Sequence, residues 1–297
     1  MSVLMQVMTL FIVMLMGLSA VKFRVLDEKG ISGLNALVLY FAQPCLIISK
    51  LQQDATPQLL QELAWVAVLT CVVMLLSALL AHWLFRKQAR DRLAVLVPLC
   101  MASNCGFMGY PVLIAAFGDG ALVYGVMYST AFTFMCWTLG SYYLGGREAI
   151  DPARLVRNPS ILAGVVGLVL LMTGWRLPSV LGNTLEMMGN ITTPLAMFVI
   201  GTRLLGLRRE HLLDLPLLAA CGLRLVVLPA LVLLLRLTPL PPMVVSVLYL
   251  CTAMPCGTLT GMQAELYNQN TALASRGVAL SSALSMVTVP LMLLFVS

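Results

Sequence analysis

Two apolar segments of the chain carry the same set of cysteine, glycine and proline residues. The residues Leu99, Cys100, Ala102, Cys105 and Gly106 recur at constant spacing as Leu250, Cys251, Ala253, Cys256 and Gly257. Pro111 follows the first set and Pro255 lies within the second, so neither segment is expected to form an unbroken helix. Interrupted helices at corresponding places in two halves of an apolar chain indicate a transporter binding site.

An interrupted helix creates anion-binding chemistry. The half-helix that follows the interruption presents unpaired N–H groups and the positive end of its dipole. Asn104 adds amide donors before the first glycine, although it could also act as a helix cap. Gly106 and Gly109 allow a ligand or another helix to approach closely. Pro111 and Pro255 are the expected points of interruption, with a plain kink as the alternative.

Arg224 is the one charged residue near the middle of an apolar run. Placing a cation at the bilayer centre costs at least about 2.5 kcal/mol, which makes it a candidate functional residue. Arg224 either attracts an anion or pairs with Glu265, or it links to the carbonyls of a broken helix. Glu265 is a possible coupling residue, although a side chain near a helix end can also snorkel to water.

Composition indicates an all-α polytopic membrane protein. Of the residues, 60% are hydrophobic and 10% are charged, against about 25% charged in soluble domains. The apolar sequence falls into ten runs of roughly 17–25 residues, each long enough to span a bilayer as a helix. The predicted spans are 2–21, 31–51, 63–84, 93–117, 121–144, 159–174, 181–205, 215–235, 243–266 and 271–296.

The distribution of basic residues predicts the orientation. Loops after odd-numbered spans contain Lys22, Arg24, Lys29, Arg86, Lys87, Arg90, Arg92, Arg147, Arg154, Arg157, Arg203, Arg208 and Arg209, whereas the other loops contain Lys50, Arg176 and Arg236. By the positive-inside rule, the odd loops are cytoplasmic and both termini lie outside the cytoplasm. The net charge of +6 therefore reflects topology, and no nucleic-acid partner is expected.

Five spans in each half predict an inverted repeat within one integral membrane domain. Residues 1–148 form the first five-helix repeat and residues 149–297 the second, and Pro44 and Pro194 support the same register. The alternative is a chance similarity of leucine- and alanine-rich helices. The paired cysteines, Cys100 with Cys105 and Cys251 with Cys256, match no metal-binding spacing, so neither a metal nor a cofactor is expected.

Several short motifs resemble the auxin efflux carrier family, which includes plant auxin carriers and bacterial permeases for small organic acids. They are Phe41-Ala42-x-Pro44, Asn104-x-Gly106-x-x-Gly109-x-Pro111, Asn158-Pro159, Thr193 to Gly201, Ala253-Met254-Pro255, Glu265-Leu266-Tyr267-Asn268 and Ser285 to Leu291. Their order along the whole chain makes the resemblance specific, although each motif alone is weak.

The resemblance implies broken fourth and ninth helices that cross near the bilayer centre, as in sodium/bile-acid symporters and sodium/proton antiporters. It also implies a homodimer in the plasma membrane, which is the inner membrane in a bacterium, and elevator-type movement of an anion. Residues expected at the substrate are Gln43, Asn104, Cys105, Gly106, Gly109, Pro111, Arg224, Pro255, Cys256, Gly257 and Thr258. Asn104 is expected to contact the substrate carboxylate directly.

The function indicated by these features is secondary transport of small organic anions, either auxin-like carboxylates or dicarboxylates. The chain has no phosphate-binding loop for ATP and no His-Glu-x-x-His motif, so it is not expected to be an ATP-driven pump or an enzyme. An ion channel is a weaker alternative because a selectivity-filter sequence is missing. Sodium- or proton-coupled transport of another solute remains open, although the spans contain almost no acidic residues.

Overall fold

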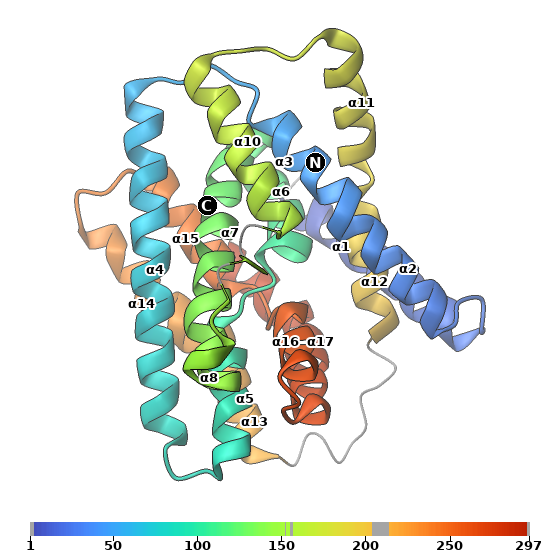
Figure 1. The fold of residues 1–297 in the computed structure, drawn as a ribbon, viewed down its shortest axis with the longest axis vertical. Coiled ribbons are helices and arrows are strands. Elements are labelled where there is room, and N and C mark those ends of the chain that lie inside the picture. Colours follow the sequence, from blue (N-terminus) through green and yellow to red (C-terminus); the bar gives the residue numbers. More distant parts are fainter. Residues whose placement is uncertain (1–2, 152, 155–156, 204–213, 296–297) are drawn as a thin grey trace.

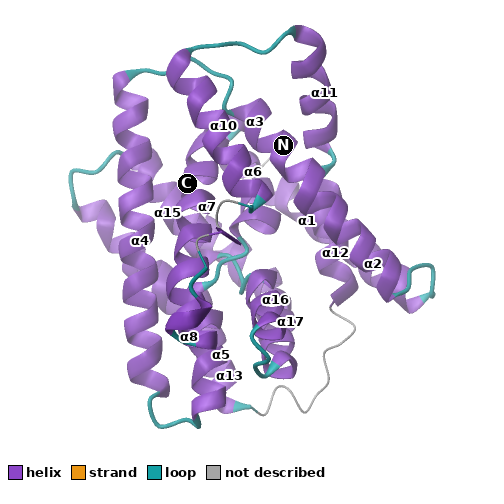
Figure 2. Ribbon diagram, viewed as in Figure 1, coloured by secondary structure: helices purple, strands orange, loops and turns teal. Residues whose placement is uncertain are grey.

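The computed structural model describes residues 3–151, 153–154, 157–203 and 214–295, and the regular structure in them is helical (Figure 2). The first part contains α1 (Val3–Lys22), α2 (Glu28–Leu37), α3 (Gln43–Lys50), α4 (Pro57–Phe85), α5 (Arg90–Met101), α6 (Tyr110–Phe117), α7 (Leu122–Met135) and α8 (Ser141–Gly145). The second contains α10 (Pro159–Thr173), α11 (Ser179–Asn190), α12 (Thr192–Thr202), α13 (Leu215–Gly222), α14 (Leu228–Leu233), α15 (Pro242–Ala253), α16 (Thr258–Leu266) and α17 (Thr271–Leu293).

Six helical ranges among the described residues are long and apolar enough to cross a membrane. They are Met5–Lys22, Glu28–Lys50, Pro57–Phe85, Asp119–Gly145, Leu215–Leu237 and Thr271–Leu293. The other four predicted spans correspond to shorter helices: α5 with α6, α10 alone, α11 with α12, and α15 with α16. The prediction of an all-helical polytopic membrane protein is therefore confirmed.

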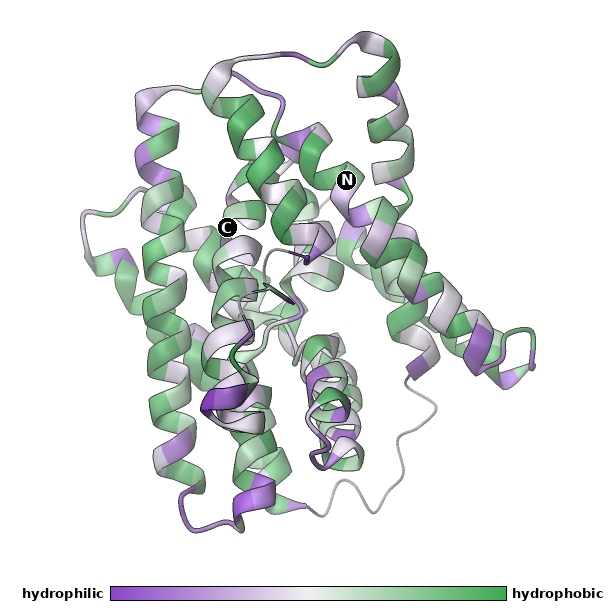
Figure 3. Cartoon of the chain, in the orientation of Figure 1, coloured by the Kyte–Doolittle hydropathy of each residue, from purple (hydrophilic) through white to green (hydrophobic). Residues whose placement is uncertain are grey.

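The outward faces of the long helices are apolar. In Figure 3, α4 is hydrophobic along most of its length and hydrophilic mainly near its ends. Its exposed apolar side chains include Val68, Val72, Leu75, Leu76 and Leu79. A helix surface of this kind suits lipid, because the helix satisfies its own backbone groups and presents hydrocarbon outward.

The helices form two groups, distinguished by their packing (Figure 1). The first helix group contains α1, α2, α3, α10, α11 and α12, in which α1 packs along α12 and α3 packs against α10 and α11. The second helix group contains α4 to α8 and α13 to α17, in which α4 packs against α5 and α7, α14 against α15, and α16 against α17. The loop between α4 and α5 lies at the lower end in Figure 1, opposite the half that holds both termini. Arg208 and Arg209 of the orientation prediction lie outside the described residues.

Glycines allow α1 and α12 of the first helix group to touch backbone to backbone. A Cβ atom on Gly17 would lie 1.9 Å from the carbonyl oxygen of Phe198, and one on Gly201 would lie 1.8 Å from that of Met14. Such close approach is typical of small-residue packing between membrane helices. The two helices are therefore packed closely enough that a side chain at either glycine would collide with the neighbouring backbone.

Three prolines follow a widened, π-helical turn. The turns Val38–Ala42, Cys105–Gly109 and Leu223–Val227 each end two residues before a proline, namely Pro44, Pro111 and Pro229. A proline lacks an N–H group, and its ring clashes with the carbonyl four residues earlier in an ordinary α-helix. A π turn moves that carbonyl away. The chain therefore passes each proline without leaving the helix.

Candidate functional site

Two non-helical segments, Ala102–Asn104 and Met254–Gly257, meet in the interior of the protein. They pair in antiparallel fashion: the Asn104 N–H donates to the Pro255 carbonyl at 2.8 Å, and the Gly257 N–H donates to the Ala102 carbonyl at 2.8 Å. Asn104 and Pro255 occupy equivalent positions in the repeated pattern, so the repeat places its own two copies side by side. The cysteine–glycine pattern thus marks a real structural junction.

The first interruption lies before Pro111, and the prediction that the helix breaks at this proline is wrong. Ala102 is extended, at φ −78° and ψ 112°, and the chain becomes helical again from Cys105. Pro111 lies within the continuous helical run Cys105–Phe117, in which the preceding π turn relieves the steric clash of its ring. The glycines Gly106 and Gly109 belong to that π turn rather than to the break.

The second interruption lies at Pro255, as predicted. Met254 is extended, at φ −68° and ψ 150°, because a residue that precedes proline is disfavoured in the α region. Gly257 then begins α16 without a side-chain cap. A Cβ atom at Gly257 would lie 2.9 Å from the Ser103 carbonyl oxygen, so the close pairing of the segments requires glycine here.

Arg224 covers the carboxyl-terminal ends of α5 and α15. It is 1% exposed, and its Nε donates to the Met254 carbonyl at 3.2 Å. Nη1 donates to the carbonyls of Cys100 and Met101 at 3.2 and 3.3 Å, and Nη2 to that of Cys251 at 3.5 Å. These oxygens have no partner within their own helices. The structure therefore favours the link to the carbonyls of a broken helix over a pair with Glu265.

A cavity of about 90 Å³ lies beside the paired interruptions. We call it the inner cavity; its lining residues are Leu39, Gln43, Ser103, Asn104, Cys105, Gly106, Phe107, Ser129, Phe132, Thr133, Asn158, Ser160, Gly257, Thr258 and Leu259. None of these residues carries a formal charge. The lining comes from both helix groups, so the cavity lies at the boundary between them.

Asn104 offers an unused donor at this cavity. Its side chain is 5% exposed, and its Nδ2 has no hydrogen-bond partner in the structure. Its backbone carbonyl accepts the N–H groups of Met108 and Gly109, both at 3.1 Å. Cap-like hydrogen bonding thus uses the Asn104 backbone and leaves the side-chain amide free. A buried donor without a partner costs about 1–3 kcal/mol, which a bound acceptor would recover.

Six of the predicted substrate residues line the inner cavity: Gln43, Asn104, Cys105, Gly106, Gly257 and Thr258. Gln43 lies against Gly106, since its Nε2 is 2.6 Å from where a Cβ atom would be. Substrate contact by these residues stays a prediction.

The other predicted residues lie outside the inner cavity lining: Gly109, Pro111, Arg224, Pro255, Cys256 and Glu265. Substrate contact by Arg224 and by the other residues of this group stays a prediction. Cys256 donates its N–H to Ser281 Oγ at 3.0 Å, and Gly109 packs near Cys105 and Met254. Glu265 is exposed and forms no ion pair within the described part of the chain.

Sequence reasoning did not select several polar residues of the cavity. Ser129 and Thr133 return their hydroxyls to α7 carbonyls, at Val126 and Ser129 respectively, so they look like ordinary helix residues. Asn158 caps α10 by accepting the N–H groups of Ser160 and Ile161. The Asn158-Pro159 pair was the available signal, because asparagine followed by proline is typical of a helix start.

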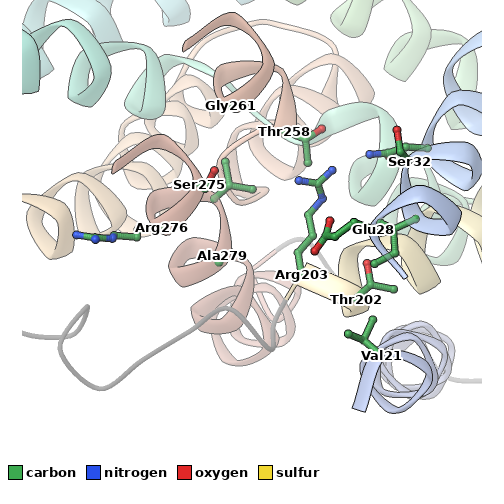
Figure 4. A pocket seen from close by; sticks show the side chains of 13 residues that line it. Val21, Glu28, Ser32, Thr202, Arg203, Thr258, Gly261, Ser275, Arg276 and Ala279 are labelled. Atoms are coloured by element: carbon green, nitrogen blue, oxygen red, sulfur yellow. The ribbon is translucent and has the colours of Figure 1, made fainter. Parts of the chain in front are cut away.

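A larger chamber of about 620 Å³ adjoins the inner cavity, because Thr258 lines both. The chamber is lined by Val21, Glu28, Ile31, Ser32, Asn35, Thr202, Arg203, Thr258, Gly261, Ser275, Arg276, Val278 and Ala279 (Figure 4). Its walls come from the ends of α1 and α12 and the beginnings of α2, α16 and α17. It also lies between the two helix groups.

Comparison with known proteins agrees with a membrane-embedded transporter. The chain matches the family described as "Membrane transport protein" over residues 2–151 and 147–293. It is 28% identical over 293 residues to an uncharacterized transporter of Methanothermobacter thermautotrophicus, covering 96% of this chain and 95% of the relative. It is 26% identical over 208 residues to an uncharacterized transporter of Methanocaldococcus jannaschii, covering 67% of this chain and 68% of the relative. The chain therefore belongs to the membrane transport protein family that includes the auxin efflux carriers, a family of multi-pass transporters and not of enzymes.

Proposed function

We propose that the protein is a secondary transporter of small organic anions that binds a carboxylate at the paired interruptions. In this proposal the ten predicted spans form an inverted repeat, residues 1–148 and 149–297, and the broken fourth and ninth spans cross at Asn104 and Pro255. The observation that carries the proposal is the unpartnered Asn104 Nδ2 in a buried, uncharged cavity.

The electrostatics of the junction favour an anion. Four half-helices meet at the junction. The negative dipole ends at the carboxyl termini of α5 and α15 would by themselves cancel the positive potential of the amino-terminal ends that follow the interruptions. Arg224 donates to the carbonyls of both carboxyl-terminal ends and so neutralises them. The two amino-terminal ends then leave a positive potential at the cavity. No carboxylate side chain among the described residues lines the cavity to cancel it.

The size of the inner cavity favours a small substrate. A volume of about 90 Å³ holds several water molecules, which suits a carboxylate of a few carbon atoms. Phe107 and Phe132 give it an apolar side that can contact the carbon chain. Short mono- or dicarboxylates therefore fit this conformation better than a large aromatic acid.

The position of both cavities between the helix groups supports elevator-type alternating access. The first helix group is joined tightly through Gly17 and Gly201 and is suited to act as the static scaffold. The second helix group carries both interruptions and is suited to move the substrate. A homodimer formed through the scaffold in the plasma membrane, with both termini outside the cytoplasm, belongs to the same proposal.

Coupling to sodium or protons is the second candidate. A cation site in this cavity would have to use carbonyl and amide oxygens, because no acidic side chain lines it. An ion channel is disfavoured because the inner cavity is small, at about 90 Å³. Counterflow with and without ion gradients separates these functions.

The test uses purified protein in liposomes and a panel of labelled acids that includes acetate, lactate, malonate, malate and indole acetate. We expect saturable uptake of at least one short carboxylate, accelerated by the same unlabelled acid inside and competed by it outside. Matched amides, such as malonamide for malonate, should not compete. Uptake of amides or cations with no response to any carboxylate would contradict the proposal, and large unitary currents would indicate a channel.

A further inference from the structure

The chamber differs from the inner cavity because it contains charged residues. Glu28, Arg203 and Arg276 line it, together with hydroxyl and amide side chains. In Figure 4, the Arg203 side chain extends from the end of α12 and points its guanidinium toward Thr258, whereas Arg276 points away from this pair. Because Thr258 also lines the inner cavity, Arg203 stands at the junction between the two spaces.

The guanidinium of Arg203 is available to an incoming anion. Glu28 lies close enough to interact electrostatically with Arg203, yet the two form no direct ion pair in the part of the chain that the structure describes. Glu28 has another source of stabilisation, because it lies in the first turn of α2, where the helix dipole favours a negative charge. Neither charged side chain therefore relies on an ion pair with the other.

We infer that Arg203 is the recruiting residue that captures the carboxylate in the chamber and passes it to Thr258 and Asn104, and that the nearby negative charge of Glu28 weakens this attraction. This inference rests on the proposed function. The planar guanidinium can accept a carboxylate in a two-pronged hydrogen-bonded pair. A single net positive charge in a recessed chamber also raises the local concentration of anions.

The relay has a direction. Arg203, Thr258 and Asn104 come from the end of α12, the start of α16 and the first interruption, in order from the chamber to the inner cavity. Only the last position is buried among uncharged groups. The anion thus leaves the exposed Arg203 for a site lined by uncharged groups, where the free Asn104 amide and the α16 amino terminus replace the guanidinium.

The experiment measures local charge at the junction without requiring transport. A cysteine introduced by Thr258→Cys is reacted with a negatively charged and a positively charged methanethiosulfonate reagent of similar size, and the parent protein corrects for the eight native cysteines. We expect Arg203→Gln to lower the ratio of anionic to cationic reaction rates about tenfold. Glu28→Gln should raise the ratio, Arg203→Lys should largely preserve it, and the matched control Arg276→Gln should change it far less than Arg203→Gln.

A second readout links the chamber to transport. In the otherwise unmodified protein, Arg203→Gln should raise KM for the transported carboxylate about tenfold with little change in kcat, since the inner cavity is untouched. An unchanged reagent ratio in Arg203→Gln, with normal carboxylate counterflow, would overturn the inference and leave the proposed function intact. A lowered ratio in a protein that transports no carboxylate would overturn the proposed function and retain Arg203 as the anion-selective group.

Discussion

The two interruptions occupy equivalent positions in the repeat but contribute different chemistry. The first provides Asn104, which lines the inner cavity and whose side-chain amide is buried without a hydrogen-bond partner. The second provides Pro255, which has no backbone N–H, and Gly257, which allows the segments to touch. One interruption is therefore suited to recognise a ligand and the other to hold the junction together. Substitutions at each interruption test whether these two roles are in fact separate.

Arg224, which serves both interruptions, is expected to produce the largest effect. Arg224→Gln would leave the buried carbonyls of Met101 and Met254 without their donor, at about 1–3 kcal/mol each, and would remove the charge that neutralises both helix ends. The carbonyls of Cys100 and Cys251 keep the hydroxyls of Ser77 and Ser103. We expect a strongly lowered melting temperature and loss of uptake. Arg224→Lys should lie between Gln and wild type. The exposed Arg236 provides the control, and equal melting temperatures for Arg224→Gln and Arg236→Gln would contradict this assignment.

Asn104 is expected to affect substrate affinity more than stability. Removing a hydrogen bond to a charged group costs about 1.5–3 kcal/mol, so Asn104→Ala should raise KM roughly 10- to 100-fold. Asn104→Asp should be worse because it places a negative charge beside the anion. Purified variants should melt close to wild type. The control is Asn183→Ala, at an exposed position in α11; a purely structural Asn104 would lower the melting temperature and leave KM unchanged.

Substitution of the two glycines that follow the cysteines distinguishes stability of the junction from recognition of the substrate. Gly257→Ala forces a Cβ atom against the Ser103 backbone, so we expect a loss of about 1–3 kcal/mol in stability. Gly106→Ala meets only the flexible end of Gln43, so it should fold normally and change KM by shifting that side chain. Thermal melts and uptake kinetics of both variants test the contrast. The reverse pattern would assign recognition to the second interruption.

Pro255 is expected to have the smallest effect. Pro255→Ala restores an N–H group, but the opposite Asn104 carbonyl already accepts two hydrogen bonds. The extended Met254 is also held by Arg224 through its carbonyl. We therefore expect a stability change below about 1 kcal/mol and nearly normal uptake. A large loss would show that the proline itself maintains the interruption.

The helical architecture could be predicted because apolar runs of membrane length leave the backbone few alternatives. The position of the first interruption could not, because Pro111 has the same sequence signature whether it breaks a helix or follows a π turn. The π turns before Pro44, Pro111 and Pro229 show that a helix can accommodate proline by a widened turn instead of by a break.

The sequence predicted those residues of the candidate site whose side-chain type and place in the chain indicate a role. Asn104 and Gly106 were found because they lie in the repeated interrupted segment, and Gln43 was expected from the family resemblance. A link between Arg224 and the carbonyls of a broken helix was one predicted role, but the sequence could not say which carbonyls take part. They belong to Cys100, Met101, Cys251 and Met254, and any residue type would provide them. Arg203 was counted only as a loop charge, since its direction toward Thr258 depends on how the end of α12 and the start of α16 line the same chamber.

The most direct test of the central claim is a distance between the bound carboxylate and Asn104. Protein with ¹⁵N-labelled asparagine side chains is bound to a transported acid carrying ¹³C in its carboxylate and studied by solid-state NMR. We predict a carboxylate-to-Nδ2 dipolar contact that matches an N···O hydrogen bond of about 2.9 Å and disappears in Asn104→Ser. Saturable binding without that contact, or with a contact that survives Asn104→Ser, would contradict the account.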